Sequence, residues 1–271
     1  MKNLIIVACH GIYNSKTGFT KEAIAKDENW CKDYKSEGSI FLRHIEEGIK
    51  LANADPDSVL IFSGGNTRVN PADISEAASY REIARHCIAW EGPCCERPME
   101  VEECATDSFE NLAFGLSRYH QIYGKYPEKV SVVSWQFKEN RFLFHWEFVK
   151  ALGIAFLDKT DFIFNGVREK PPAGYQKALS GEAKTLVNFS LNPYSQAGIL
   201  LELRQKRQPA GYMSPVYTDP CFMAIKKIRE QARSLTQIPI TSTHDFFASA
   251  YRFFGGLLSG RSNAAPTPTA P

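Results

Sequence analysis

The sequence predicts an α/β fold of the Rossmann-like, doubly wound type, with a mainly parallel sheet and helices on both faces. Short apolar runs alternate with segments whose apolar residues recur at helical spacing, which is typical of buried parallel strands joined by helices. Glycine and polar residues gather directly after those apolar runs, where the loops of such a sheet bind ligands. The alternation stops near residue 170, which predicts a helical C-terminal extension packed on the sheet domain.

Strands are expected at residues 4–9, 59–62, 99–103, 130–133 and 161–164. Helices are expected between them at residues 37–54, from about 73 to the Gly92-Pro93 stop, at 107–123 and at 138–152. The polar stretch 12–35 is expected to be a long loop, and Asn165-Gly166 is expected to be the turn after the last strand.

Two of the expected helices begin with a capping-box pattern. Asp73 with Glu76 opens the second helix, and Asp107 with Glu110 opens the third. Gly124 is expected to end that third helix in a left-handed conformation.

The chain is expected to divide into a Rossmann-like domain over residues 1–169, a helical extension over 170–261 and a disordered tail over 262–271. The helices expected in the extension cover residues 180–191, 194–208, 220–235 and 243–255. The tail is rich in proline, threonine and alanine, a composition that cannot bury a core.

Composition excludes several classes of protein. A net charge of +2 with scattered basic residues argues against a nucleic-acid-binding surface. No apolar run reaches the roughly 18 residues of a membrane-spanning helix, so no membrane partner is expected. The apolar run at the start covers only residues 4–9, too short for a signal peptide, which favours a cytoplasmic protein.

The seven cysteines are expected to be unpaired thiols, because their number is odd and no secretory signal is recognised. Cys94-Cys95, with His86, Cys87 and Cys104 nearby, raises the alternative of a zinc site. No Cys-x-x-Cys spacing supports that alternative, so the sequence predicts no metal site.

The carboxyl ends of parallel strands share one edge of a sheet, so the residues that follow the strands are expected to lie together. The residues expected at this edge are His10, Gly11, Ser63, Gly64, Gly65, Asn66, Arg68, Glu76, Thr106, Asn111, Ser134, Gln136, Lys138 and Arg141. Backbone N–H groups exposed by a Gly-Gly loop, together with two cations, suit a phosphate- or carboxylate-bearing ligand.

Four motifs in this set resemble those of a known family. They are Ser63-Gly64-Gly65, Ser75-Glu76-Ala77, Thr106 with Glu110-Asn111-Leu112-Ala113, and the loop from Ser134 that closes on Arg141. Each lies at a strand-to-helix joint, and their order resembles the SanA/YdcF-like family, domain of unknown function 218, over residues 3–166. The resemblance implies a polar pocket at the strand ends that holds a nucleotide-like or S-adenosylmethionine-like ligand, without a secure activity.

The chain departs from that family in three ways. Cys9-His10-Gly11 stands where many members have a glycine-rich loop, and Lys138 stands where many have a histidine three residues before the final arginine. Many members also carry an N-terminal membrane anchor and some are tied to bacterial envelope processes, whereas no anchor is recognised here. The Lys138 departure argues against histidine-based acid–base chemistry at that position, and the missing anchor argues against an envelope role.

His10, Lys138 and Arg141 are the candidate catalytic residues. Histidine titrates near neutral pH, so His10 is expected to transfer protons, and Arg141 is expected to bind a phosphate or carboxylate through two N–H donors. A structural histidine is the alternative for His10, and a surface ion pair with Glu139 or Glu147 is the alternative for Arg141.

The remaining candidates are expected to bind the ligand, and each has a structural alternative. Gly64 and Gly65 either let the backbone approach the ligand or form a tight turn. Glu76 either binds a ribose or amine of the ligand or caps its helix, and Asn111 either faces the ligand or caps locally.

These residues predict a transferase or hydrolase acting on a nucleotide-like or phosphate- or carboxylate-bearing small molecule. The alternatives are a non-catalytic ligand-binding or regulatory module, and an interaction scaffold built on the extension. Helix 138–152 is apolar on more than one face, which fits either burial under the extension or a homo-oligomer contact. No Gly-x-Gly-x-x-Gly follows the first strand, which argues against dinucleotide-dependent dehydrogenases. The glycines follow the second strand instead, and no acidic residue ends that strand, which argues against class I methyltransferases.

Overall fold

The computed structural model describes residues 1–31, 37–68, 73–154, 156–168, 175–208 and 214–236. Two compact units, Met1–Glu230 and Gln231–Pro271, make up the chain. Every contact discussed below lies within the first unit.

A five-stranded sheet with the order β5-β4-β1-β6-β7 forms the centre of this unit. Its strands are β1 (Asn3–Ala8), β4 (Ser58–Ser63), β5 (Met99–Glu102), β6 (Lys129–Trp135) and β7 (Asp161–Val167). All neighbouring strands pair in parallel, and Ala8 lies in register with Ser63. The predicted parallel α/β fold is therefore confirmed.

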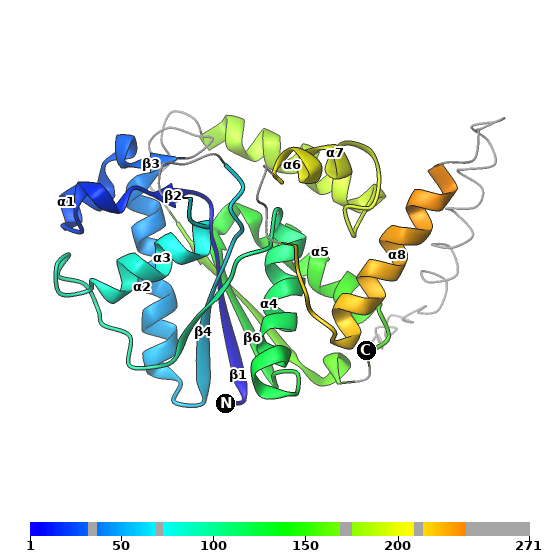
Figure 1. Ribbon diagram of the computed structural model, residues 1–271, viewed down its shortest axis with the longest axis horizontal. Helices are drawn as coiled ribbons and strands as arrows, with labels where there is room; N and C mark the ends of the chain where they lie inside the picture. The colour runs from blue at the N-terminus through cyan, green and yellow to red at the C-terminus, as the bar shows by residue number, and fades with distance from the viewer. Residues whose placement is uncertain (32–36, 69–72, 155, 169–174, 209–213, 237–271) are drawn as a thin grey trace, which may run out of the picture. The chain divides into compact units, whose positions relative to one another are not determined.

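Helices cover both faces of the sheet because side chains alternate between the faces along each strand. Ile5 and Val7 of β1 pack with α2 (Gly38–Ala54) and α3 (Glu76–Arg85) on one face. Leu4 and Ile6 pack with α4 (Ser108–Tyr123) and α5 (Glu139–Lys150) on the other. Figure 1 shows the two pairs of helices on opposite sides of the strands.

Residues 12–31 are not the long loop expected. They form β2 (Ile12–Tyr13), η1 (Ser15–Thr17), α1 (Lys21–Ala25), η2 (Asp27–Asn29) and β3 (Trp30–Cys31). β2 and β3 pair antiparallel, and Tyr13, Ile24 and Trp30 are buried in the core on the α2 side. These elements are only two to five residues long, too short for a periodic pattern to show in the sequence.

The expected turn at Asn165-Gly166 is wrong, because both residues belong to β7 and pair with Val133 and Ser134 of β6. β6 leads into η3 (Gln136–Lys138) before α5 begins, and η4 (Leu157–Lys159) precedes β7. The extra strand length brings β7 level with the end of β6.

Asp73 does not cap α3. Its N-cap is Ser75, whose side chain accepts a hydrogen bond from the Ala78 N–H, while Asp73 lies outside the helix with a φ of 47°. The Asp107 cap of α4 is confirmed, because its side chain accepts from the Glu110 N–H. Gly124 ends α4 with a φ of 67°, as predicted.

Three helices follow β7 in the described chain: α6 (Tyr175–Leu191), α7 (Gly198–Lys206) and α8 (Pro220–Thr236). Phe189, Leu200 and Phe222 from this part of the chain are buried in the core that also contains α4 and α5. The helix expected at 243–255 and the tail at 262–271 lie outside the described residues. No helix among the described residues is both long enough and apolar enough to cross a membrane.

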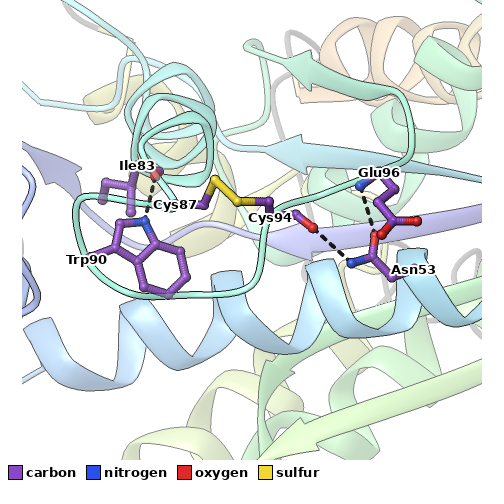
Figure 2. The surroundings of a disulfide bond; sticks show 6 residues. All are labelled: Asn53, Ile83, Cys87, Trp90, Cys94 and Glu96. Atoms are coloured by element: carbon purple, nitrogen blue, oxygen red, sulfur yellow. Dashed lines mark hydrogen bonds between the residues drawn. A yellow bond between two sulfur atoms is a disulfide. The ribbon is translucent and has the colours of Figure 1, made fainter.

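A disulfide joins Cys87 to Cys94 across the loop that follows α3, so the expectation of unpaired thiols is wrong for these two cysteines. Their Cα atoms are 5.2 Å apart, within the range that a disulfide requires. Figure 2 shows the loop, in which Trp90 Nε1 donates to the Ile83 carbonyl. Asn53 of α2 binds the Cys94 carbonyl and the Glu96 N–H, which holds the loop against α2 (Figure 2).

Candidate functional site

The strand order places a topological switch point between β1 and β6, where the chain runs outward in opposite directions along the sheet. His10 follows β1 and Ser134 lies near the end of β6, with His10 Nε2 3.1 Å from Ser134 Oγ. Lys138 of η3 places its Nζ 3.4 Å from the same nitrogen. The structure therefore brings together three of the residues predicted from separate strand ends.

Burial and neighbouring cations control protonation in this cluster. Burial and the charge of Lys138 hold the pKa of His10 well below its usual value, so the imidazole is neutral at pH 7. Burial and the charge of Arg141 lower the pKa of Lys138 to about 7. A charged ammonium can only donate, so His10 Nε2 accepts whenever Lys138 is protonated. The cluster thus combines a neutral base with a lysine that titrates near neutral pH.

His44 of α2 contacts His10, although no sequence pattern assigns His44 to the site. The two rings meet edge to face with centroids 5.5 Å apart, and His44 also contacts Trp135. His44 is fully buried, its ring nitrogens have no partner among the described residues, and burial lowers its pKa to about 3. Its position on the apolar face of a predicted helix was the only sequence signal, and that signal indicated core packing.

The glycines after β4 serve packing rather than exposing N–H groups as expected. Gly64 donates its N–H to the Glu102 carbonyl at 2.9 Å, and Gly65 donates to the Ala105 carbonyl at 2.7 Å. A Cβ atom on Gly64 would lie 2.9 Å from Cys9 Cβ, and one on Gly65 would lie 2.9 Å from the Ala105 carbonyl oxygen. Both positions therefore require glycine because the chain passes close to its neighbours.

Glu76, at the start of α3, binds the loop after β4. Its Oε1 accepts hydrogen bonds from Thr67 Oγ1 at 2.6 Å and from Arg68 Nη1 at 2.8 Å. Asn66 in the same loop donates to Asp73 at 2.9 Å. The Arg68 charge is thus compensated by a carboxylate within the protein.

Three further candidates lie in a buried network at the ends of β4 and β5. Asn111 Nδ2 donates to the Ser63 carbonyl at 2.8 Å, and Ser63 Oγ donates to Glu102 at 2.6 Å. Thr106 donates to the Glu110 carboxylate through both its N–H, at 2.8 Å, and its hydroxyl, at 2.7 Å. All five residues are buried, so these groups support the loops that surround the site.

Glu110 is the centre of a charge cluster that connects this network to the helices after β7. Its Oε1 lies 2.8 Å from Nη1 of Arg229 in α8 and 3.5 Å from Nη1 of Arg204 in α7. Burial alone raises the pKa of the Glu110 carboxyl, but the two guanidinium groups outweigh it and hold the pKa below its usual value. Arg207 also donates to the Thr106 carbonyl at 2.9 Å.

Arg141 lies on α5, and its partner is a residue that the sequence did not indicate. Its Nε donates to Glu182 Oε1 of α6 at 2.8 Å, its Nη2 donates to Glu182 Oε2, and its Nη1 reaches Ser108 Oγ at 3.3 Å. Gln136 instead donates to Glu139 at the surface, and Gly11 is buried directly after His10. The expected alternatives for Arg141, Glu139 and Glu147, are not its partners.

Comparison with known proteins gives one distant relative. The chain is 23% identical, over 263 aligned positions, to the uncharacterized protein YOR238W of Saccharomyces cerevisiae, covering 78% of this chain and 85% of that protein. No family model matches the sequence. No solved structure matches it either.

Proposed function

We propose that this chain binds a small anionic ligand, nucleotide-like or otherwise phosphate- or carboxylate-bearing, at the carboxyl edge of its sheet beside Lys138. The observation that carries this proposal is the contrast among the three nearby cations. Arg68 is paired with Glu76 and Arg141 with Glu182, whereas no carboxylate of the described residues forms an ion pair with Lys138. Glu182 and Glu37 act on Lys138 only from beyond ion-pair distance, and an anion beside Lys138 would provide the direct partner that these carboxylates do not.

Acid–base chemistry is the activity that we assign to the same place. His10 is neutral and lies 3.4 Å from an ammonium whose pKa is about 7, so one group can accept and the other donate a proton at physiological pH. A transferase or hydrolase reaction on the bound ligand needs such a pair. The alternative of a non-catalytic binding module is favoured by Ser134, which is fully buried and occupies one nitrogen of His10.

Membership of the SanA/YdcF-like family is part of the proposal. What supports it is the position of the resembling motifs, which all lie at strand-to-helix joints on one edge of the sheet. An S-adenosylmethionine-like or nucleotide-like ligand is what that membership implies.

A thermal-shift comparison tests the binding proposal. We expect AMP, UDP-glucose or S-adenosylmethionine to raise the melting temperature of the wild type by about 5 °C or more at a hundred times its dissociation constant. Lys138→Gln should lose that shift. Lys150→Gln removes the same charge from the exposed side of α5, where Lys150 pairs with Glu147, and should keep the shift. Equal shifts in all three proteins would contradict an anion site at Lys138.

The variant His10→Gln distinguishes a catalytic site from a site that only binds the ligand. If the site is catalytic, this variant should retain the ligand-induced shift and lose turnover of the ligand by about a hundredfold or more. Unchanged turnover would leave His10 a structural residue.

A further inference from the structure

A serine and a histidine form a close pair beside Arg141, outside the His10 cluster. Ser108 is the first residue of α4, and His145 lies on α5 one turn beyond Arg141. Ser108 Oγ is 2.9 Å from His145 Nε2, and Arg141 Nη1 is 3.3 Å from the same Oγ. His145 is not among the residues predicted from the strand ends.

Ser108 Oγ lies between a guanidinium donor and an imidazole nitrogen. A guanidinium group has no acceptor, so Arg141 must donate to Ser108 Oγ. In the tautomer with the ring proton on Nδ1, the Ser108 hydroxyl donates to His145 Nε2, and Nδ1 then has no hydrogen-bond partner among the described residues. This is the tautomer in which an imidazole can take a proton from serine.

The surroundings of His145 keep its imidazole neutral. His145 is fully buried, and the rings of Phe109, Phe142 and Phe189 surround it. Burial and the nearby Arg141 charge hold its pKa well below the usual value. Ser108 itself is only partly buried.

We propose that Ser108 is a nucleophile and His145 its general base, and that the pair hydrolyses carboxylic esters. Arg141, held in place by Glu182, directs one N–H donor at the Ser108 oxygen. We assign to this pair an ester that carries an anionic group; that group rests on the proposed ligand site at Lys138, whereas the Ser108–His145 pair does not.

The reaction balances in two steps. In the first, the Ser108 Oγ–carbon bond forms as the hydroxyl proton passes to His145 Nε2, and the bond to the leaving alcohol breaks as His145 returns that proton to its oxygen. In the second, water attacks the acyl carbon and gives a proton to His145. The Ser108 Oγ–carbon bond then breaks, and His145 returns the proton to Ser108 Oγ. One ester and one water give one carboxylic acid and one alcohol.

Diisopropyl fluorophosphate tests the pair directly, because it is neutral and does not require an anion site. Attack forms a Ser108 Oγ–phosphorus bond and breaks the phosphorus–fluorine bond, and the serine proton leaves through His145 with fluoride. We expect peptide mass spectrometry to find the diisopropylphosphoryl group on Ser108 of the wild type. Ser108→Ala should remove it, and His145→Gln should slow labelling by about a hundredfold or more.

Two variants serve as matched controls. Ser190→Ala removes an exposed serine on α6 that binds only the Val187 carbonyl, and His120→Gln removes a histidine near the other end of α4. Both should be labelled at Ser108 at the wild-type rate. No label on Ser108 of the wild type, or an equal rate in folded His145→Gln, would overturn this inference and leave the ligand site at Lys138 untouched, since only the thermal-shift series reports on that site.

Discussion

Lys138 reaches from the joint after β6 to within 3.4 Å of His10 Nε2, at the end of β1. The two residues are 128 positions apart in the chain, and the switch point of the sheet brings them together. Because burial and Arg141 lower the Lys138 pKa to about 7, small changes in its surroundings alter its charge near neutral pH. Two pH effects follow from this relationship.

Ligand binding is expected to take up protons. An anion beside Lys138 raises its pKa from about 7, so at pH 7.5 the complex holds more protons than the separate molecules. Calorimetric titration of the ligand found by thermal shift, in Tris and in HEPES, should give an uptake of less than one proton per ligand. Affinity should decline by up to tenfold per pH unit above 7, and a flat affinity profile would count against Lys138.

Without ligand, the same lysine should make stability depend on pH. Its folded-state pKa of about 7 lies below the unfolded value of about 10.4, so the unfolded chain binds more protons between these limits. Lys138 therefore contributes a free energy of unfolding that rises with pH through this window. Urea unfolding between pH 7 and 10 should show that the free energy of unfolding rises less with pH in Lys138→Gln than in the wild type. The same rise in both proteins would contradict the lowered pKa of Lys138.

The pair between Arg141 and Glu182 should be strongly coupled. Only 12% and 10% of the two side chains are exposed, so removal of either partner leaves a nearly buried charge. Arg141→Gln and Glu182→Gln should each lower the free energy of unfolding by about 3 kcal/mol. The double variant should lose about 1–3 kcal/mol less than the sum, and strict additivity in urea unfolding would show that the pair is not an energetic unit.

Glu110→Gln should be more damaging, because it leaves Arg229 and Arg204 without their carboxylate. We expect a loss of about 3–5 kcal/mol at pH 7. The folded pKa of Glu110 is lowered, so this contribution is present above the unfolded pKa of about 4.3 and is lost as pH falls through the folded value. Glu147→Gln, at a side chain that is 66% exposed, should change stability by less than about 0.5 kcal/mol in the same urea titrations.

Reduction of the disulfide should destabilise the folded protein. Cys87 and Cys94 are separated by 7 positions. Closing a loop of this size reduces the entropy of the unfolded chain, which raises its free energy by roughly 2–3 kcal/mol at 25 °C. Tris(2-carboxyethyl)phosphine should lower the urea midpoint of the wild type. A Cys87→Ser, Cys94→Ser double variant should have the lower urea midpoint from the start, and the reductant should not change it. An equal fall of the midpoint in both proteins would show that the reductant acts at another site.

The sheet could be predicted because its strands are long enough to show a pattern. β1, β4 and β6 each contain a run of mostly apolar residues, whereas their order in the sheet comes from the structure. Residues 12–31 could not be predicted, because buried Trp30 rather than a periodic pattern holds their two-residue strands in place. Ser75, rather than Asp73, caps α3 for a similar reason, since both residue types are good caps and only the path of the chain selects one.

The candidate site was predictable only as far as strand ends determine it. His10, Ser134 and Lys138 meet because parallel strands end together. Charge partners of the site come from helices after β7, such as Glu182 on Arg141 and Arg229 on Glu110, and no local pattern links such distant positions. The Ser108–His145 pair could not be predicted, because His145 lies among aromatic residues of α5 that indicate core packing.

The ion pair between Glu110 and Arg229 cannot form until late in synthesis of the protein. The two residues are separated by 119 positions, so a ribosome produces the carboxylate long before its final partner. Until α8 emerges, Glu110 must remain hydrated, because its burial without a guanidinium group would cost several kcal/mol. The Thr106 loop that Glu110 holds should therefore acquire its final form last, after translation has passed Arg229.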